Sequence, residues 1–212
     1  MLQDFFSSTL ATLLVTLDPP GLAPIFISLT QGMDGAQRLQ VALRACLIAF
    51  AIMTFFALGG GHILSLLGIG LPAFRIAGGI LLFWIAFEMV FRSRGERKAE
   101  AAQSAVTIDR IRNVAAFPLA IPLLAGPGAI TATILLAGRA DTDPRLLAIL
   151  VALIGAVLAS CALVFVMAQG VARLLGVTGN VVLSRLLGVI MAALAVQFVI
   201  DGVDAARHAL GG

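Results

Sequence analysis

Six apolar segments of this chain are each long enough to cross a lipid bilayer as a helix, which takes about 20 apolar residues in a row. They cover residues 5–29, 41–67, 71–91, 114–137, 146–171 and 181–199. The chain of 212 residues is 60% hydrophobic and only 12% charged, and a soluble domain of this length could not bury so much apolar surface. The sequence therefore predicts an all-α integral membrane protein with six transmembrane helices, whose first partner is the lipid bilayer.

A hydrophilic stretch at residues 92–112 divides the six segments into two groups of three. Residues 66–68 and 174–176 both read Leu-Leu-Gly, and the residues after Arg75 resemble those after Arg185. Because three is an odd number of spans, the second group must enter the membrane from the opposite side, which makes the two groups an inverted repeat. The expected organisation is a first three-helix repeat at residues 1–91, a linker at 92–112 and a second three-helix repeat at 113–212.

Two of the segments are interrupted in the middle by proline and glycine. The first reads Asp-Pro-Pro-Gly at residues 18–21, and the fourth reads Gly-Pro-Gly at residues 126–128. Proline removes a backbone donor and glycine loosens the chain, so we expect helices 1 and 4 to be broken there. A bilayer tolerates the freed backbone groups only where protein or a wet cavity surrounds them. Such breaks at corresponding places in two halves indicate the binding site of a transporter.

Asp18 is a carboxylate in the middle of a span, where it costs about 2.5 kcal/mol or more unless it is paired or hydrated. It could accept a substrate ammonium, bind a coupling proton or cap the half-helix that follows. The half-helix N-termini near Gly21 and Gly128 would offer N–H groups to an anion such as an amino-acid carboxylate. The hydroxyl of Thr131 could line the path or bond to a carbonyl of its own helix. The predicted substrate-binding residues are Asp18, Pro20, Gly21, Gly126, Pro127, Gly128 and Thr131.

Lysine and arginine are distributed unevenly between the two expected faces of the membrane. Ten of the 14 lie on the side of the linker, namely Arg38, Arg44, Arg92, Arg94, Arg97, Lys98, Arg110, Arg112, Arg173 and Arg185. The positive-inside rule then places the linker in the cytoplasm and both termini on the outer side. This bias accounts for the basic isoelectric point of about 9.7 without a nucleic-acid partner.

Arg75 and Arg185 occupy corresponding positions in the two halves, each about one turn into its segment. They could anchor the helix ends at the membrane surface by snorkelling. They could also act as paired gates on the two sides of an alternating-access site, because cations within spans often mark a transport path. Both are therefore candidate gating residues.

Residues 18–30 (DPPGLAPIFISLT) and 118–131 (PLAIPLLAGPGAIT) resemble the two signature stretches of the MarC-related family of bacterial inner-membrane proteins. Arg75 followed by Gly78 and Gly79 also fits, and the resemblance covers nearly the whole chain. It implies six spans in a bacterial inner membrane, periplasmic termini and, for some members, transport of small neutral amino acids. More distantly, the chain is similar to the lysine-exporter superfamily, which would favour export.

These features together favour a secondary transporter of small solutes, foremost neutral amino acids, which works by alternating access and is not an enzyme. The expected coupling ion is a proton or sodium; no cofactor or metal site is expected, and glycine-rich faces leave a homo-oligomer open. A drug or metabolite exporter is one alternative. Another is a transmembrane thiol–disulfide oxidoreductase, which needs cysteines at matched places in the two halves. Cys46 and Cys161 miss that equivalence by at least a helical turn.

Overall fold

The computed structural model describes residues 2–91, 114–140 and 143–210, and these residues form helices without any strand. The helices are α1 (Leu2–Leu17), α2 (Pro19–Leu29), α3 (Gly35–Leu66), α4 (Leu71–Phe91), the π-type helix η1 (Ala115–Leu124), α7 (Pro127–Ala140), α8 (Pro144–Val166) and α9 (Ala168–Leu210). Five spans are long and apolar enough to cross a membrane, and the bent pair η1–α7 makes up to six. The chain is an all-α membrane protein, as predicted. The expected linker at 92–112 lies outside the described residues.

Both predicted helix breaks are present. In the first span, α1 ends at Leu17 and α2 begins at Pro19. In the fourth span, η1 and α7 meet at an angle of 56°. Within η1, Phe117 and Ile121 have extended backbone angles, because the residue before a proline is disfavoured from helical geometry.

The last span is longer than its apolar run predicted. The sequence placed its end at residue 199, whereas α9 continues to Leu210 and its membrane-length part covers Val181–His208. Asp201 and Asp204 ended the apolar run in the sequence, but Asp201 is paired with Arg139 and Asp204 is exposed, so the helix passes through both. Its N-terminal part, from Ala168, is offset from the rest by a backbone interruption at Gly176.

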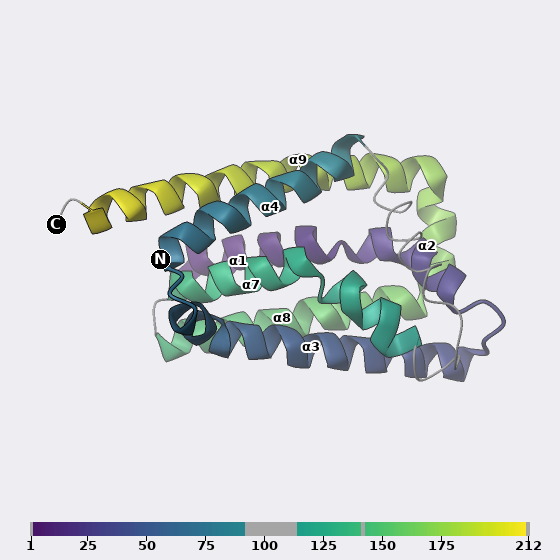
Figure 1. The fold of residues 1–212 in the computed structure, drawn as a ribbon. Coiled ribbons are helices and arrows are strands. Elements are labelled where there is room, and N and C mark those ends of the chain that lie inside the picture. The colour runs from purple at the N-terminus through teal and green to yellow at the C-terminus, as the bar shows by residue number, and fades with distance from the viewer. Residues whose placement is uncertain (1, 92–113, 141–142, 211–212) are drawn as a thin grey trace.

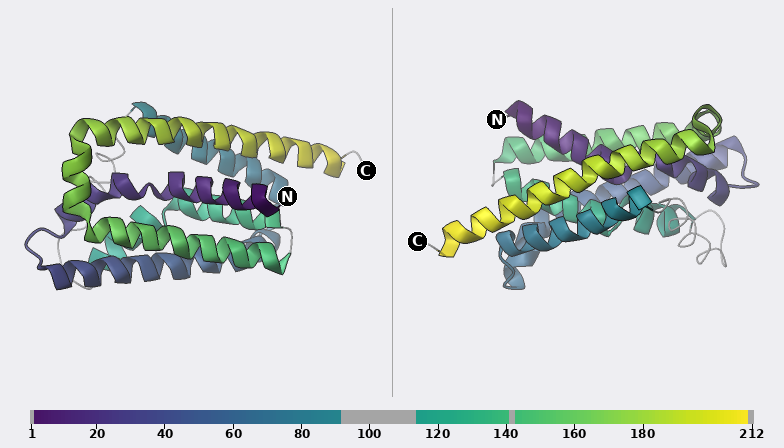
Figure 2. Two further views of the ribbon diagram at one scale, coloured as in Figure 1. Left: turned by 180° about the vertical axis from the view of Figure 1, so that it is seen from behind. Right: turned by 90° about the horizontal axis from the view of Figure 1, so that it is seen from above.

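The helices form three layers, which Figures 1 and 2 show from several sides. The broken spans α1–α2 and η1–α7 make the middle layer. The pair α4 and α9 covers one side of it, and the pair α3 and α8 covers the other. Each layer therefore contains corresponding helices from the two halves, running in opposite directions. The inverted repeat itself stays a prediction.

The two chain ends lie at the same end of the bundle, which we call the terminal end (Figure 1). The α2–α3 connection and the junction of α8 with α9 lie at the opposite end. Both broken spans therefore run the length of the bundle, and their breaks lie in its interior rather than at a surface.

Glycines allow α4 and α9 to approach closely. A Cβ added to Gly79 would lie 2.7 Å from the backbone oxygen of Ala195, and one added to Gly188 would lie 3.2 Å from the backbone oxygen of Ala86. Real Cβ atoms are essentially never found closer than 3.0 Å to such an atom, so Gly79 permits this contact and a larger residue would separate the helices. Small residues at helix contacts are the usual basis of packing inside membranes.

Replacing Gly79 by alanine should therefore destabilise the protein by about 1–3 kcal/mol, because the obstructing atom belongs to the backbone and cannot rotate away. Thermal unfolding in detergent measures the change. Gly59→Ala is the matched control, because a Cβ there meets nothing within 4 Å. Equal unfolding temperatures for the two variants would contradict the close approach of α4 and α9.

Candidate functional site

Asp18 forms the junction between α1 and α2 and is only 1% exposed. Its backbone is left-handed, with φ 48° and ψ 63°, a conformation that aspartate and asparagine tolerate better than most residues. Its carboxylate Oδ1 accepts a hydrogen bond from the backbone N–H of Gly21 at 3.1 Å. Asp18 is therefore the N-cap of α2, placed where the positive end of the helix dipole stabilises a negative charge.

Because the two residues after Asp18 are prolines, few N–H groups at the start of α2 need an acceptor from outside the helix. Pro19 and Pro20 occupy the first positions of α2 and have no N–H, so the N–H of Gly21 is the first one that needs an acceptor. A Cβ on Gly21 would overlap the carboxylate of Asp18. The N–H that the sequence analysis assigned to a substrate carboxylate is therefore already engaged by Asp18 itself.

The second break also begins its helix with a proline but lacks the carboxylate and the left-handed backbone of Asp18. Gly126 stands where Asp18 stands in the first break, since its carbonyl accepts the N–H of Ile130 at 3.0 Å and Pro127 follows as the first helical residue. Matching Asp18 with Gly126 shifts the two helix starts by one residue relative to an alignment of the two Pro-Gly pairs, which are Pro20-Gly21 and Pro127-Gly128. Gly126 has no side chain to cap α7. A Cβ there would overlap the carbonyl oxygen of Pro122, so the space for a capping side chain is absent.

The second break lies against the end of α1 and the middle of α4. A Cβ on Gly128 would lie 2.8 Å from Cδ1 of Ile85 and 3.9 Å from Cγ2 of Thr16, two residues before Asp18. One turn later, the methyl group of Thr131 packs on Gly78 of α4. The fold thus brings Gly128 and Thr131 to the part of the middle layer where α1 ends.

A row of buried hydroxyls on α1 was not found from the sequence. Thr9, Thr12 and Thr16 are all buried on this helix, which leads from the terminal end to Asp18. The hydroxyls of Thr12 and Thr16 donate to the carbonyls four residues earlier, at 2.7 and 2.6 Å. That of Thr9 has no hydrogen-bond partner among the described residues. The available signal in the sequence was the spacing of four residues between Ser8, Thr12 and Thr16. This spacing is frequent in apolar helices, so it did not mark these hydroxyls as functional.

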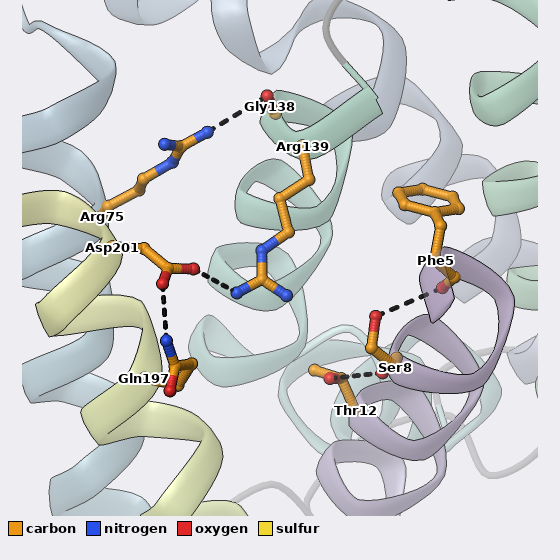
Figure 3. A network of polar contacts seen from close by, with 8 residues as sticks. All are labelled: Phe5, Ser8, Thr12, Arg75, Gly138, Arg139, Gln197 and Asp201. Carbon is orange, nitrogen blue, oxygen red and sulfur yellow. Dashed lines mark hydrogen bonds and ion pairs between the residues drawn. The ribbon is translucent and has the colours of Figure 1, made fainter. Parts of the chain in front are cut away.

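A polar network at the terminal end connects α4, α7 and α9 (Figure 3). Arg75 donates to the backbone oxygen of Gly138 at 3.2 Å. Arg139 forms an ion pair with Asp201, and the amide of Gln197 donates to the same carboxylate at 2.7 Å. We call these residues the terminal network.

The ion pair of this network is partly open to solvent, with side-chain exposures of 25% for Arg139 and 30% for Asp201. The guanidinium of Arg139 also lies 4.6 Å from the centre of the Phe198 ring, a distance typical of cation–π contacts. From the sequence, neither Arg139 nor Asp201 was predicted to be a functional residue. The two are 62 residues apart, and no local pattern joins them.

The two candidate gating arginines have different surroundings. Arg75 is half-buried and belongs to the terminal network. Arg185 is exposed and lies in the N-terminal half of α9, the half that follows the junction with α8. The two cysteines are buried and in no disulfide, Cys46 on α3 and Cys161 on α8.

The sequence profile described as MarC family integral membrane protein matches residues 3–206 of the chain. A UPF0056 membrane protein of Archaeoglobus fulgidus is 38% identical over 94% of this chain and 92% of the relative. One from Aquifex aeolicus is 37% identical over 93% of this chain and 92% of its own length. The UPF0056 membrane protein YhcE of Escherichia coli K12 is 35% identical over 96% of both chains. No solved structure matches.

Substitutions of Asp18 should separate its role as a cap from its role as a charge. Asp18→Ala removes the acceptor and should destabilise the protein by about 0.5–2 kcal/mol, as the loss of an N-cap does elsewhere. Asp18→Asn keeps an acceptor oxygen and tolerates the left-handed backbone, so it should retain most of the stability. Thermal unfolding in detergent compares the two. A loss in Asp18→Asn as large as that in Asp18→Ala would show that the charge, rather than the cap, stabilises the break.

Proposed function

The chain belongs to the MarC family of integral membrane proteins, and from that premise we propose that it is a secondary transporter of small solutes, foremost neutral amino acids, rather than an enzyme. The observation that carries the proposal is the middle layer. It consists of two broken spans from the two halves, covered on both sides by unbroken helices, with the buried carboxylate of Asp18 at one break. Broken helices at corresponding places near the membrane centre are typical binding elements of transporters.

The two breaks offer a zwitterion two different partners. Asp18 supplies a negative charge for an ammonium group, although it already accepts the N–H of Gly21. Because that carboxylate occupies the start of α2, a second anion there would be repelled. The start of α7 carries no capping side chain, so its first-turn N–H groups, at Gly128 and Ala129, are the better partners for a substrate carboxylate. Thr131 and the apolar residues around Gly128 would contact the uncharged remainder of the solute.

The terminal network suits a gate at the terminal end of the path. It connects α4, α7 and α9 through Arg75, Arg139 and Asp201. Ion pairs exposed to this degree contribute only about 0.2–1 kcal/mol, so they can form and break during a transport cycle. Arg185, in the N-terminal half of α9, is the candidate gating residue for the other side.

Orientation and coupling belong to the same proposal. The charge bias favours periplasmic termini and a cytoplasmic segment at residues 92–112 in a bacterial inner membrane. The family itself is broader, since relatives occur in archaea as well as bacteria. A proton or sodium ion would drive the cycle, and Asp18 is the carboxylate placed to respond to either.

Flux measurements in proteoliposomes test the site. We expect uptake of radiolabelled L-alanine, L-serine or L-leucine under a proton or sodium gradient. Both Asp18→Asn and Gly128→Ala should reduce it at least tenfold, because the first removes the charge and the second places a methyl group at the α7 start, 2.8 Å from Cδ1 of Ile85. Asp204→Asn makes the same chemical change at an exposed position and should transport normally. Undiminished flux in both site variants would exclude the breaks as the binding site.

Opening of the terminal end should follow from weakening its network. In a background of Cys46→Ser and Cys161→Ser, a reporter thiol is introduced by Thr12→Cys, on the buried face of α1. Asp201→Asn should increase the labelling rate of this thiol by a membrane-impermeant maleimide severalfold, because Arg139 loses its charged partner. Asp204→Asn again serves as the control. An unchanged labelling rate would show that the network does not close this end.

A further inference from the structure

Away from the breaks, a cavity of about 260 Å³ lies beside the α2–α3 connection and the junction of α8 with α9. Residues of α2, α3, α8 and α9 line it, among them Phe26, Thr30, Arg38, Phe165 and Gln169. Drug-sized ligands occupy pockets of about 300–1,000 Å³, so this space suits a smaller molecule. Asp18 lies at the other end of α2 from the residues of that helix that line the cavity.

Among the described residues that line the cavity, Arg38 alone carries a charge. Its side chain is half-buried, and its Nε is fully buried without a hydrogen-bond partner among the described residues. Arg38 lines the cavity, so an anion bound there would give its guanidinium a charged acceptor.

Asp34 is the carboxylate closest to Arg38 along the chain, and it already has hydrogen-bond partners. Asp34 caps α3 by accepting the backbone N–H of Gln37 at 2.8 Å, and the Gln37 side chain accepts the N–H of Asp34 in return at 3.1 Å. This capping box stabilises the helix start and leaves the guanidinium of Arg38 available to the cavity.

The remaining walls are mainly apolar. Phe26 and Phe165, each 1% exposed, stack with their ring centres 4.6 Å apart and their planes within 7°. The hydroxyl of Thr30 donates to the carbonyl of Phe26 at 2.7 Å, so it offers the cavity only an acceptor. Gln169 adds an amide. A ligand that satisfies this lining has one negatively charged oxygen group and a small apolar body.

We propose that the cavity binds an oxyanion carried on an apolar body, with Arg38 as its charged partner. Two sources have this chemistry, a free carboxylate solute and the phosphate of an anionic lipid at the membrane surface. The guanidinium geometry fits either one, since it can donate two parallel hydrogen bonds to a carboxylate or a phosphate. The site goes beyond the proposed transport at the breaks, because it uses none of the residues assigned there.

The test compares thermal stabilisation of the purified protein by matched probes at constant ionic strength. The solute arm uses isovalerate and its uncharged counterpart isovaleramide in a neutral detergent. The lipid arm adds phosphatidylglycerol or the uncharged diacylglycerol, which lacks the phosphate, to the micelles. A ligand that binds only the folded state raises the unfolding temperature with its concentration. Each arm is run on the wild type, on Arg38→Gln and on Arg44→Gln, which removes an exposed arginine of the same helix outside the cavity.

We expect stabilisation by isovalerate or by phosphatidylglycerol, but not by the uncharged probe of the same arm. The concentration needed should rise about tenfold or more in Arg38→Gln, as the loss of a charge-assisted hydrogen bond implies, and stay unchanged in Arg44→Gln. The arm that responds identifies the source. Arg38→Lys keeps the charge and should bind the anion with intermediate affinity. If Arg38→Gln does not fold, Arg38→Lys replaces it as the test variant.

Stabilisation by neither anion would overturn the proposal. So would equal stabilisation by the anionic and uncharged probes, or binding that survives in Arg38→Gln. These outcomes leave the transport proposal untouched, because flux through Asp18 and Gly128 is measured separately.

Discussion

The hydrogen bond between the carboxylate of Asp18 and the N–H of Gly21 is the interaction on which the middle of this molecule depends. A helix interrupted inside an apolar bundle leaves N–H groups that neither lipid nor apolar side chains can satisfy. Pro19 and Pro20 reduce the number of such groups, and Asp18 accepts the first one that remains. The dipole of α2 in turn stabilises the buried charge. The buried carboxylate of the first span is thus also the cap of its second helix.

Both breaks begin their second helix with a proline, but they differ in what they leave for a ligand. At the first, the helix start is filled by the protein's own carboxylate. At the second, Gly126 allows the chain to pass close to Pro122 and provides no cap. One break therefore presents a negative charge and the other presents backbone donors. Under the proposed transport function, this combination would suit a zwitterion, and two identical breaks would not provide it.

The ends of the bundle are also unlike each other. At the terminal end, Arg75, Arg139 and Asp201 join three helices through partly exposed polar contacts. At the opposite end, the packing leaves a cavity beside Arg38, with the stacked rings of Phe26 and Phe165 on its wall. Contacts that are individually weak can be exchanged at low energetic cost. The close glycine contacts between α4 and α9, in contrast, are rigid and give the outer layer a fixed geometry.

The sequence by itself determined the membrane class, most span positions, both breaks and the burial of Asp18, because apolar length and Pro-Gly chemistry act locally along the chain. It also indicated which residues could cap a helix or bind a ligand. It did not show that Asp18 caps α2 through the N–H of Gly21. Only the tertiary structure decided the partners of Arg139 and Asp201, the continuation of α9 past residue 199 and the cavity beside Arg38. Each of these depends on contacts between side chains that are distant in the sequence. In the sequence, Asp201 looks like the end of an apolar run, but α9 tolerates its charge because Arg139 of α7 pairs with it.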